Sequence, residues 1–400
     1  MKRWIISLAT LLSLWSPWGQ ATITCERNYS NRTDYVNYTV PILSSGIIIS
    51  AMRDLPIGGI LFRQVIKDPD AATLGFMKCL NNSGGIEAAI RTTRFAPDGA
   101  LPGVVSTWSG HNVYDTGVPG IGMVLLHGAY GAAWQEATHG ETFPHLQSEE
   151  LYTFGGSYMG AGNTMGVWVL EILLVKTGDI PAGTWTVPIN LPPMVIDGQL
   201  TGDLSPESVK KDYGARFTIF GSVNVLAGTC QTPDVSVPMG QHEVSGSTVN
   251  TNWVDFKISL LNCPPMYGRY SKNHPEASQA TNQWMASGSI EGLPDQPNTV
   301  GISLNPVSGY ETLASGGQCA KLTPSTDTAS GACLEIQNVT GTNVLTNSFT
   351  NTVTDSGLTL LASAASYQIP LKARYGLIAG SSTMTAGKAD SAIEFTINYQ

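Results

Sequence analysis

The sequence predicts an all-β protein that contains two β-sandwiches, and three observations lead to this fold class. Apolar residues recur at every second position in several short segments, which is the period of a strand that buries one face. Clusters of Gly, Pro and Asn separate these segments, and the 43 glycines among 400 residues are about 11%, above the usual ~7%. No sustained helical pattern occurs, and the length exceeds that of one ordinary domain.

The chain is acidic and sparsely charged, which limits its partners. It carries 21 basic and 30 acidic residues, a formal charge of −9, and charged residues are 13% of the total. Because no Lys/Arg cluster is present to attract phosphates, nucleic acid is not expected as a partner.

Residues 1–21 have the pattern of a secretory signal peptide. The positive residues Lys2 and Arg3 precede an apolar run from Trp4 to Trp15, and small residues follow it. This run is too short to span ~30 Å of hydrocarbon. The mature chain is therefore expected to be exported.

Six cysteines in an exported chain indicate disulfides, although they allow fifteen pairings. Two lie in the first half of the chain and four in the second. Pairing neighbours gives Cys25–Cys79, Cys230–Cys263 and Cys319–Cys333. The absence of a Cys-x-x-Cys motif argues against structural zinc.

A polar segment separates two strand-rich regions. Residues 197–214 combine Gly, Pro, acids and lysines with little periodicity, and are predicted to link a domain at 22–196 to one at 215–400. The first region contains three strand-like runs, Val40–Ser50, Ile121–His127 and Val167–Val175.

The second region alternates more regularly. Phe217, Ile219, Val223 and Val225 share one face and precede a turn and Cys230. Later strands are predicted at Trp253–Leu261, Val300–Leu304, Cys333–Val339, Leu358–Ala362 and Ile369–Tyr375. The polar, Pro-containing stretch Pro264–Gln283 is predicted to be a surface excursion.

The chain ends in a strand with one apolar face. Ile393, Phe395, Ile397 and Tyr399 point one way, and the polar residues between them point the other. Burial of each apolar side chain contributes roughly 1.5–3 kcal/mol, and ordering the backbone costs ~1–2 kcal/mol per residue. We therefore expect this strand to be stable only when it is packed and paired.

These segments together resemble the pilin domains of chaperone–usher fimbriae, which include type 1-like pili. The resemblance covers residues 216–400. It rests on the strand Phe217–Cys230, the Cys230/Cys263 pair, the element Ile369–Tyr375 and the tail Ile393–Gln400. The Cys319/Cys333 pair and the 264–283 excursion depart from the compact pattern of that family.

The resemblance implies an immunoglobulin-like sandwich that lacks its last strand. In such domains a periplasmic chaperone first fills the groove, and a strand of the next pilus subunit replaces it at an outer-membrane usher. The resemblance places eight residues in this groove, namely Phe217, Ile219, Val223, Val225, Ile393, Phe395, Ile397 and Tyr399.

A polymerising pilin also donates a free segment at its mature N-terminus, whereas a folded region begins here almost at once, near Cys25. The chain is therefore expected to accept a strand without donating one, and to stand at the fimbrial tip on the cell surface after passing through the periplasm. Residues 22–196 more weakly resemble the lectin-like receptor-binding domains of tip adhesins. The alternative is a non-adhesive minor or adaptor subunit.

Recognition of a glycan requires aromatic faces and polar side chains. One stretch concentrates both, with Trp108, His111, Asn112, Tyr114, Asp115, Trp134 and His139. We expect a glycan or another surface receptor to bind there, with Trp108 or Trp134 as the stacking platform. The alternative is that both tryptophans belong to the core.

Neither a metal site nor a catalytic site is expected. His111, His139 and His145 could supply imidazoles to zinc, but their spacing matches no common zinc motif. Residues 155–160 approach a nucleophile elbow, but Met159 replaces its second glycine. No cofactor and no enzymatic activity are therefore predicted.

Overall fold

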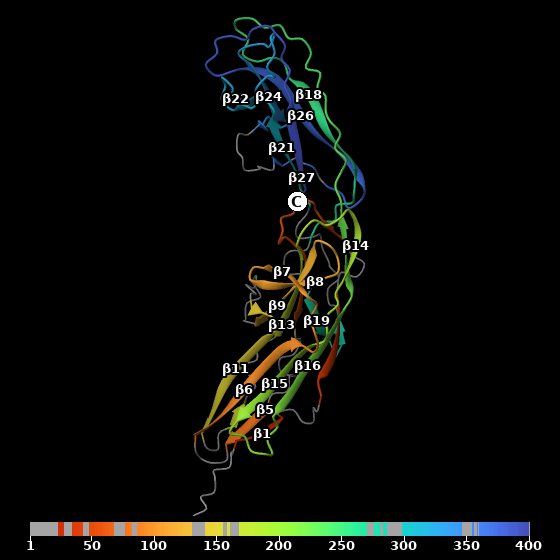
Figure 1. Ribbon diagram of the computed structural model, residues 1–400, viewed down its shortest axis with the longest axis vertical. Coiled ribbons are helices and arrows are strands. Elements are labelled where there is room, and N and C mark those ends of the chain that lie inside the picture. Colours follow the sequence, from red (N-terminus) through yellow and green to blue (C-terminus); the bar gives the residue numbers. More distant parts are fainter. Residues whose placement is uncertain are drawn as a thin grey trace, which may run out of the picture.

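The computed structural model describes residues 23–27, 34–42, 48–67, 77–81, 86–129, 141–154, 158–160, 168–269, 276–280, 283–285, 298–345, 354–355, 358 and 360–399. The predicted signal peptide lies outside these residues. All regular elements within them are strands, and no helix there is long and apolar enough to cross a membrane. The predicted all-β class is confirmed, and Figure 1 shows two bodies that follow one another along the long axis.

The first body contains two large and two small sheets. An eight-stranded sheet has the spatial order β20 (Gln283–Met285), β19 (Glu276–Ala280), β4 (Ile60–Lys67), β13 (Trp168–Lys176), β9 (Ile121–Ala129), β8 (His111–Asp115) and β7 (Val104–Trp108), with β10 (Glu141–Thr142) beside β9. A five-stranded sheet has the order β11 (His145–Phe154), β6 (Ile86–Pro97), β15 (Met194–Gly202), β16 (Lys211–Phe220) and β2 (Val36–Pro41). The small sheets contain β1 (Ile23–Arg27), β5 (Met77–Asn81) and β12 (Tyr158–Gly160), and β14 (Gly183–Pro188), β17 (Ser222–Ala227) and β3 (Ile48–Ala51).

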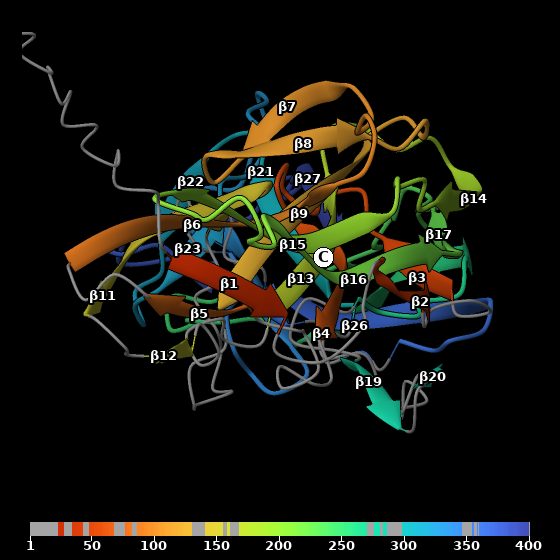
Figure 2. The ribbon, with the colours of Figure 1, turned by 90° about the horizontal axis from the view of Figure 1, so that it is seen from below.

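One apolar core joins the two large sheets and the sheet of β14, β17 and β3, whereas the sheet of β1, β5 and β12 packs on a smaller cluster of its own. Phe62, Phe95, Ile172 and Phe217 come from β4, β6, β13 and β16, and each is at most 3% exposed. Seen along the long axis, β7 and β8 lie on one side of the molecule and β19 and β20 on the other (Figure 2), as expected for opposite edges of one sheet.

The predicted linker is wrong. Residues 197–202 complete β15 and residues 211–214 begin β16, and these two strands pair antiparallel. β16 also pairs in parallel with β2, and β17 pairs in parallel with β3. The first sandwich therefore continues through Ala227, beyond the predicted boundary at 214.

Four of the predicted groove residues consequently belong to the first core. Phe217, Ile219, Val223 and Val225 pack against the first-body cluster and are at most 4% exposed. Their alternation correctly indicated strand structure with one buried face, although the residues divide between two strands, β16 and β17. Alternation does not specify which of two cores receives that face, and only the strand pairing decides it.

The second body contains two sheets of unequal size. The larger has the order β18 (Val254–Cys263), β26 (Ala365–Leu377), β24 (Ala332–Asn338), β23 (Gln318–Ala320) and β22 (Tyr310–Thr312). The smaller has β25 (Thr354–Asp355), β21 (Val300–Pro306) and β27 (Ile393–Tyr399). Four of the strands predicted here overlap β18, β21, β24 and β26, whereas the described part of Leu358–Ala362 forms no strand.

The excursion predicted at Pro264–Gln283 is more than a surface loop. Within it, Glu276–Ala280 forms β19, which pairs in parallel with β4 of the first body. Tyr267 and Gly268 also bond to Ser50, since the Tyr267 amide donates to Ser50 Oγ at 2.8 Å and the Ser50 amide donates to the Gly268 carbonyl at 2.9 Å. This stretch therefore connects the two bodies.

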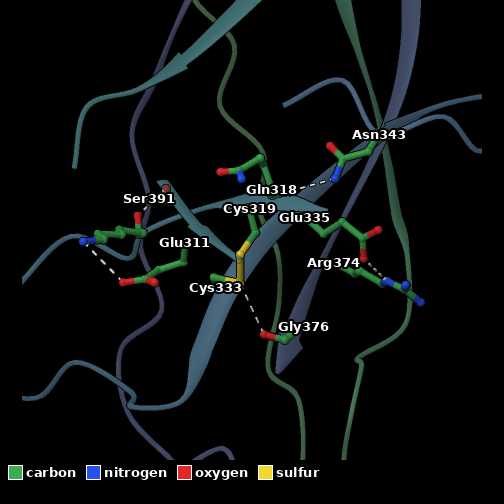
Figure 3. Close-up of a disulfide and its surroundings, with 10 residues drawn as sticks. Glu311, Gln318, Cys319, Cys333, Glu335, Asn343, Arg374, Gly376 and Ser391 are labelled. Carbon is green, nitrogen blue, oxygen red and sulfur yellow. Dashed lines mark hydrogen bonds and ion pairs between the residues drawn. A yellow bond between two sulfur atoms is a disulfide. The ribbon is translucent and has the colours of Figure 1, made fainter. Parts of the chain in front are cut away.

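The three disulfides join the neighbours expected from the sequence, Cys25–Cys79, Cys230–Cys263 and Cys319–Cys333. The last of these joins β23 to β24, as Figure 3 shows together with the ion pair between Arg374 Nε and Glu335 Oε2 at 2.7 Å. Each disulfide closes a chain segment within one body.

Candidate functional site: a strand-acceptor groove

A groove of about 740 Å³ with an apolar floor opens along the second sandwich. Its floor comes from the larger sheet, with Phe256 and Ile258 of β18, Leu334 and Ile336 of β24, and Ala373 and Tyr375 of β26. One wall is β27, through Ile393 and Phe395. These floor residues are core positions of a sandwich whose smaller sheet stops at β27, so the groove lies where a further strand would cover them.

The opposite wall is an extended segment that the sequence prediction missed. Between bridges at Gln231 and Asn250, residues 232–248 pair with no strand of the described chain. Val235, Val237 and Met239 alternate with exposed residues and line the groove. The signal was present in the sequence as three apolar residues at period two just after Cys230. Three features obscure it, Pro233, Pro238 and Gly240, because Pro and Gly disfavour strands.

The strand β27 presents one free edge to the groove. Its other edge pairs with β21 from Val300↔Tyr399 to Pro306↔Ile393. Within the described residues no strand pairs with the free edge. Along this edge, from Ile393 to the Ile397 amide, the backbone N–H and C=O groups are thus accessible to an additional strand.

The four predicted residues of β27 do share one face. Ile393 and Phe395 are half-buried and line the groove, while Ile397 and Tyr399 are 5% and 1% exposed. All four also line a second cavity of about 540 Å³ at the end of β27 nearer the first body. Arg53 of the first body also lines this second cavity, and the remaining lining residues are Cys230, Thr232, Asp234, Glu394 and Thr396.

Polar groups at the other end of the groove are bonded within the wall. The Tyr375 hydroxyl donates to the Ala389 carbonyl at 2.5 Å, and burial, assisted by the charge of Asp390, raises the pKa of this phenol. The His242 ring lies edge-on to the Tyr375 ring at 5.8 Å, and its Nε2 is 2.8 Å from the Met239 carbonyl oxygen. Tyr375 therefore stays neutral near pH 7 and fixes the wall.

The arrangement suits an extended peptide. A free strand edge supplies main-chain hydrogen bonds, and the groove floor beside it takes alternate side chains. In the described parts of the chain, no group of three or more His, Cys, Asp or Glu is placed to hold a metal ion. The groove can therefore act through shape, apolar contact and strand pairing.

The predicted receptor-binding residues lie on the first body. Trp108 and His111 face each other across the β7–β8 turn, whose Ser109 and Gly110 have positive φ as in a tight hairpin. The Trp108 indole N–H donates to the Gly58 carbonyl at 2.8 Å and its ring is half-buried. His111 is 9% exposed.

The remaining residues of that set divide between surface and core. Asn112 and Asp115 are exposed, and Asp115 Oδ1 accepts from the Gly117 amide at 2.8 Å. Tyr114 is 5% exposed and packs in the first core, which removes its ring from the surface. Trp134 and His139 lie outside the described residues, as does the side chain of His145.

Comparisons with known proteins give structural neighbours only. No protein-family model matches the chain, and no curated protein matches it. The CupB6 tip adhesin from Pseudomonas aeruginosa is 15% identical with a TM-score of 0.25, and 94% of each chain is covered. The Proteus mirabilis ambient temperature fimbriae adhesin AtfE is 14% identical with a TM-score of 0.27, over 48% of this chain and 99% of that one.

Proposed function

We propose that this protein is a fimbrial tip adhesin, exported to the periplasm and then displayed on the cell surface. The second sandwich accepts a strand, first from a periplasmic chaperone and then, at the outer-membrane usher, from the next pilus subunit. The observation that carries the proposal is the apolar groove beside the free edge of β27.

The energetics of the groove support strand acceptance. Half-buried Val235, Met239, Ile393 and Phe395 pack only partly against the second core. A strand laid between them would bury these side chains further, at roughly 25 cal/mol per Å² of apolar surface. It would also satisfy the open edge of β27, which otherwise invites uncontrolled association.

In this proposal the first sandwich is the receptor-binding domain. Its strand Ile23–Arg27 is paired with β5 and fixed by the Cys25–Cys79 disulfide, so this segment is engaged within its own body. We propose that the β7–β8 hairpin contacts a surface glycan through exposed Asn112 and Asp115 and the half-exposed ring of Trp108.

Chaperone capture tests the strand-acceptor role. Replacing both Phe395 and Ile397 with Ser should abolish recovery of a soluble complex when the chain is co-expressed with its fimbrial chaperone. The matched control replaces Glu394 and Thr396, which are exposed on the opposite face of the same strand, with Ser. Equal recovery of the two double variants would contradict the role of β27.

Glycan-array binding by the full chain separates an adhesin from an adaptor subunit. An adhesin should give hits that weaken in Trp108→Ala and Asn112→Ala variants while chaperone capture is unchanged. Absence of any hit, with chaperone capture intact, would favour the non-adhesive adaptor. Hits that neither substitution changes would place the receptor site elsewhere on the first sandwich.

A further inference from the structure

A turn of the first body covers one end of the acceptor edge. The Tyr399 amide donates to Asp54 Oδ2 at 2.9 Å, and the Asp54 amide donates to the Tyr399 carbonyl at 3.2 Å. Arg53 Nη2 donates to the Ile397 carbonyl at 2.7 Å, and its guanidinium lies 5.5 Å from the centre of the Tyr399 ring. Residues more than 340 positions apart are thus joined at the junction of the two bodies, where β27 ends (Figure 1).

These bonds identify which backbone groups of β27 face the free edge. In an antiparallel pair, the N–H and C=O groups of successive residues point alternately toward and away from the partner strand. The Tyr399 groups and the Ile397 carbonyl bond to Asp54 and Arg53, so they point away from β21. By the same alternation, the groups of Ile393 and Phe395 and the Ile397 amide face the open groove.

Arg53 and Asp54 therefore occupy the positions that an added strand would take beside the last residues of β27. Arg53 also lines the second cavity, at the end of the acceptor edge. Two hydrogen bonds from Arg53 to Asp54, at 2.8 and 2.9 Å, hold the two side chains together. An incoming strand can pair beyond Ile397 only by breaking this set of bonds.

A buried lysine fixes the turn from behind. Lys176 is 5% exposed, and its Nζ donates to the carbonyls of Arg53 at 2.5 Å and Leu55 at 2.8 Å. Met52, next to Arg53, is 2% exposed and packs into the core of the second body. The turn is thus anchored on both sides, in the first body through Lys176 and in the second through Met52.

We propose that Arg53 and Asp54 form a stop that limits how far an added strand can pair along β27. The strand of the next subunit pairs from Ile393 to the Ile397 amide and ends against the Arg53 guanidinium. The first sandwich thereby sets the length of strand that the second accepts. This inference rests on the proposed function, since it takes the groove to receive a strand.

Peptides of graded length test the stop. Peptides of alternating Val and Thr, lengthened in steps of two residues, are titrated by calorimetry into the full chain. In the unaltered chain the affinity should rise with length and then reach a plateau. In the Arg53→Ala/Asp54→Ala variant the plateau should begin two residues later, at an affinity roughly three- to tenfold higher, because more edge hydrogen bonds become available. A plateau at the same length in both proteins overturns the inference.

The matched control and a second measurement keep the outcomes distinct. Arg216→Ala/Asp98→Ala removes another Arg–Asp pair, joined at 2.6 Å in the first sandwich, and should leave the plateau unchanged. The second measurement uses the unaltered chain and a peptide of the length at which the affinity plateau begins, with a photoreactive residue at its end. This residue should cross-link to residues 52–55. Cross-links to other residues only would overturn the inference, and this test requires no variant. If the unaltered chain binds no peptide of any length, both the proposed function and this inference fail.

Discussion

The buried carboxylate of Asp197 holds several strands of the first sandwich together. Asp197 lies in the stretch that the sequence predicted as a linker, yet its side chain is only 7% exposed. Arg94 donates to both of its oxygens, at 3.0 and 2.7 Å, and the Tyr35 hydroxyl donates to Oδ2 at 2.5 Å. Lys211 Nζ lies 3.5 Å from the same oxygen. A charge with this many partners joins β6, β15 and β16 on one sheet.

Removing the charge of Asp197 should destabilise the first sandwich. Breaking a fully buried ion pair costs ~3–5 kcal/mol. Arg94 remains 38% exposed, so we expect Asp197→Asn to cost about 2 kcal/mol and to lower the melting temperature by roughly 4–8 °C. Scanning calorimetry measures this shift. Asp98→Asn, at an exposed Arg216 pair, is the control and should cost under about 1 kcal/mol; equal losses in the two variants would contradict the argument.

The same residue gives a pH dependence with a definite sign. Burial disfavours the ionised form of Asp197, but hydrogen bonds from Arg94 and Tyr35 outweigh it and hold the pKa below its ordinary value. A carboxylate with a lowered folded-state pKa stabilises the fold above its unfolded pKa of ~3.9, and this contribution is lost as the pH falls through the folded-state pKa. Urea unfolding of the first sandwich measures its free energy of unfolding at pH 5 and at pH 3. Between these two pH values, this free energy should fall less in Asp197→Asn than in the unaltered chain. An equal fall in the free energy of unfolding in the two proteins would mean that other carboxylates dominate the destabilisation by acid.

At the scale of the elements, the sequence predicted strands better than it predicted their partners. The runs at 121–127, 300–304 and 393–399 fall in strands, and 253–261 does so from Val254. The tail 393–399 shows the period of two that one buried face imposes, whereas 121–127 is buried on both faces and was indicated by its continuous apolar run. The sequence prediction missed the groove wall at 232–244 and assigned residues 217–225 to the groove instead. Phe217, Ile219, Val223 and Val225 keep a period of two across Gly221, whereas Pro233 and Pro238 break the pattern that follows. Local periodicity carries no information on which sheet a strand joins.

Matched substitutions in these two segments test that reassignment. Met239→Ser should weaken binding of an alternating Val/Thr peptide by about tenfold, because the thioether lines the groove, and should leave the first sandwich unchanged. Phe217→Ala should instead cost the first sandwich about 3–5 kcal/mol and leave peptide affinity unchanged, since its ring is 3% exposed in the other core. Calorimetric titration and urea unfolding measure the two effects. Loss of peptide affinity in a folded Phe217→Ala protein would restore the original assignment.

The whole molecule combines two sandwiches, and within the described residues one edge of β27 in the second has no partner strand. The presence of two bodies was predicted from the chain length and the two strand-rich regions, but neither the boundary between the bodies nor their contacts could be predicted. Ser50, Arg53 and Asp54 form hydrogen bonds with residues beyond position 266. Hydrophobic periodicity is a local pattern, and it does not predict contacts between residues so far apart in the sequence. The predicted receptor residues show the same limit, because Asn112 and Tyr114, two residues apart on β8, lie on the surface and in the core respectively.

Binding of an added strand should raise the thermal stability of the second sandwich only. Two cores give two unfolding transitions in calorimetry, and a ligand stabilises the part that it binds by about 2.7 kcal/mol at one hundred times its Kd. An alternating Val/Thr peptide at that concentration should raise the transition of the second sandwich by roughly 5–10 °C and leave that of the first nearly fixed. A peptide of the same composition in the order Val-Val-Thr-Thr, which cannot place Val at every second position, should shift neither transition. Equal shifts of both transitions with the alternating peptide would mean that the sandwiches unfold as one unit, and the incomplete sandwich could not then be treated as a separately completed body.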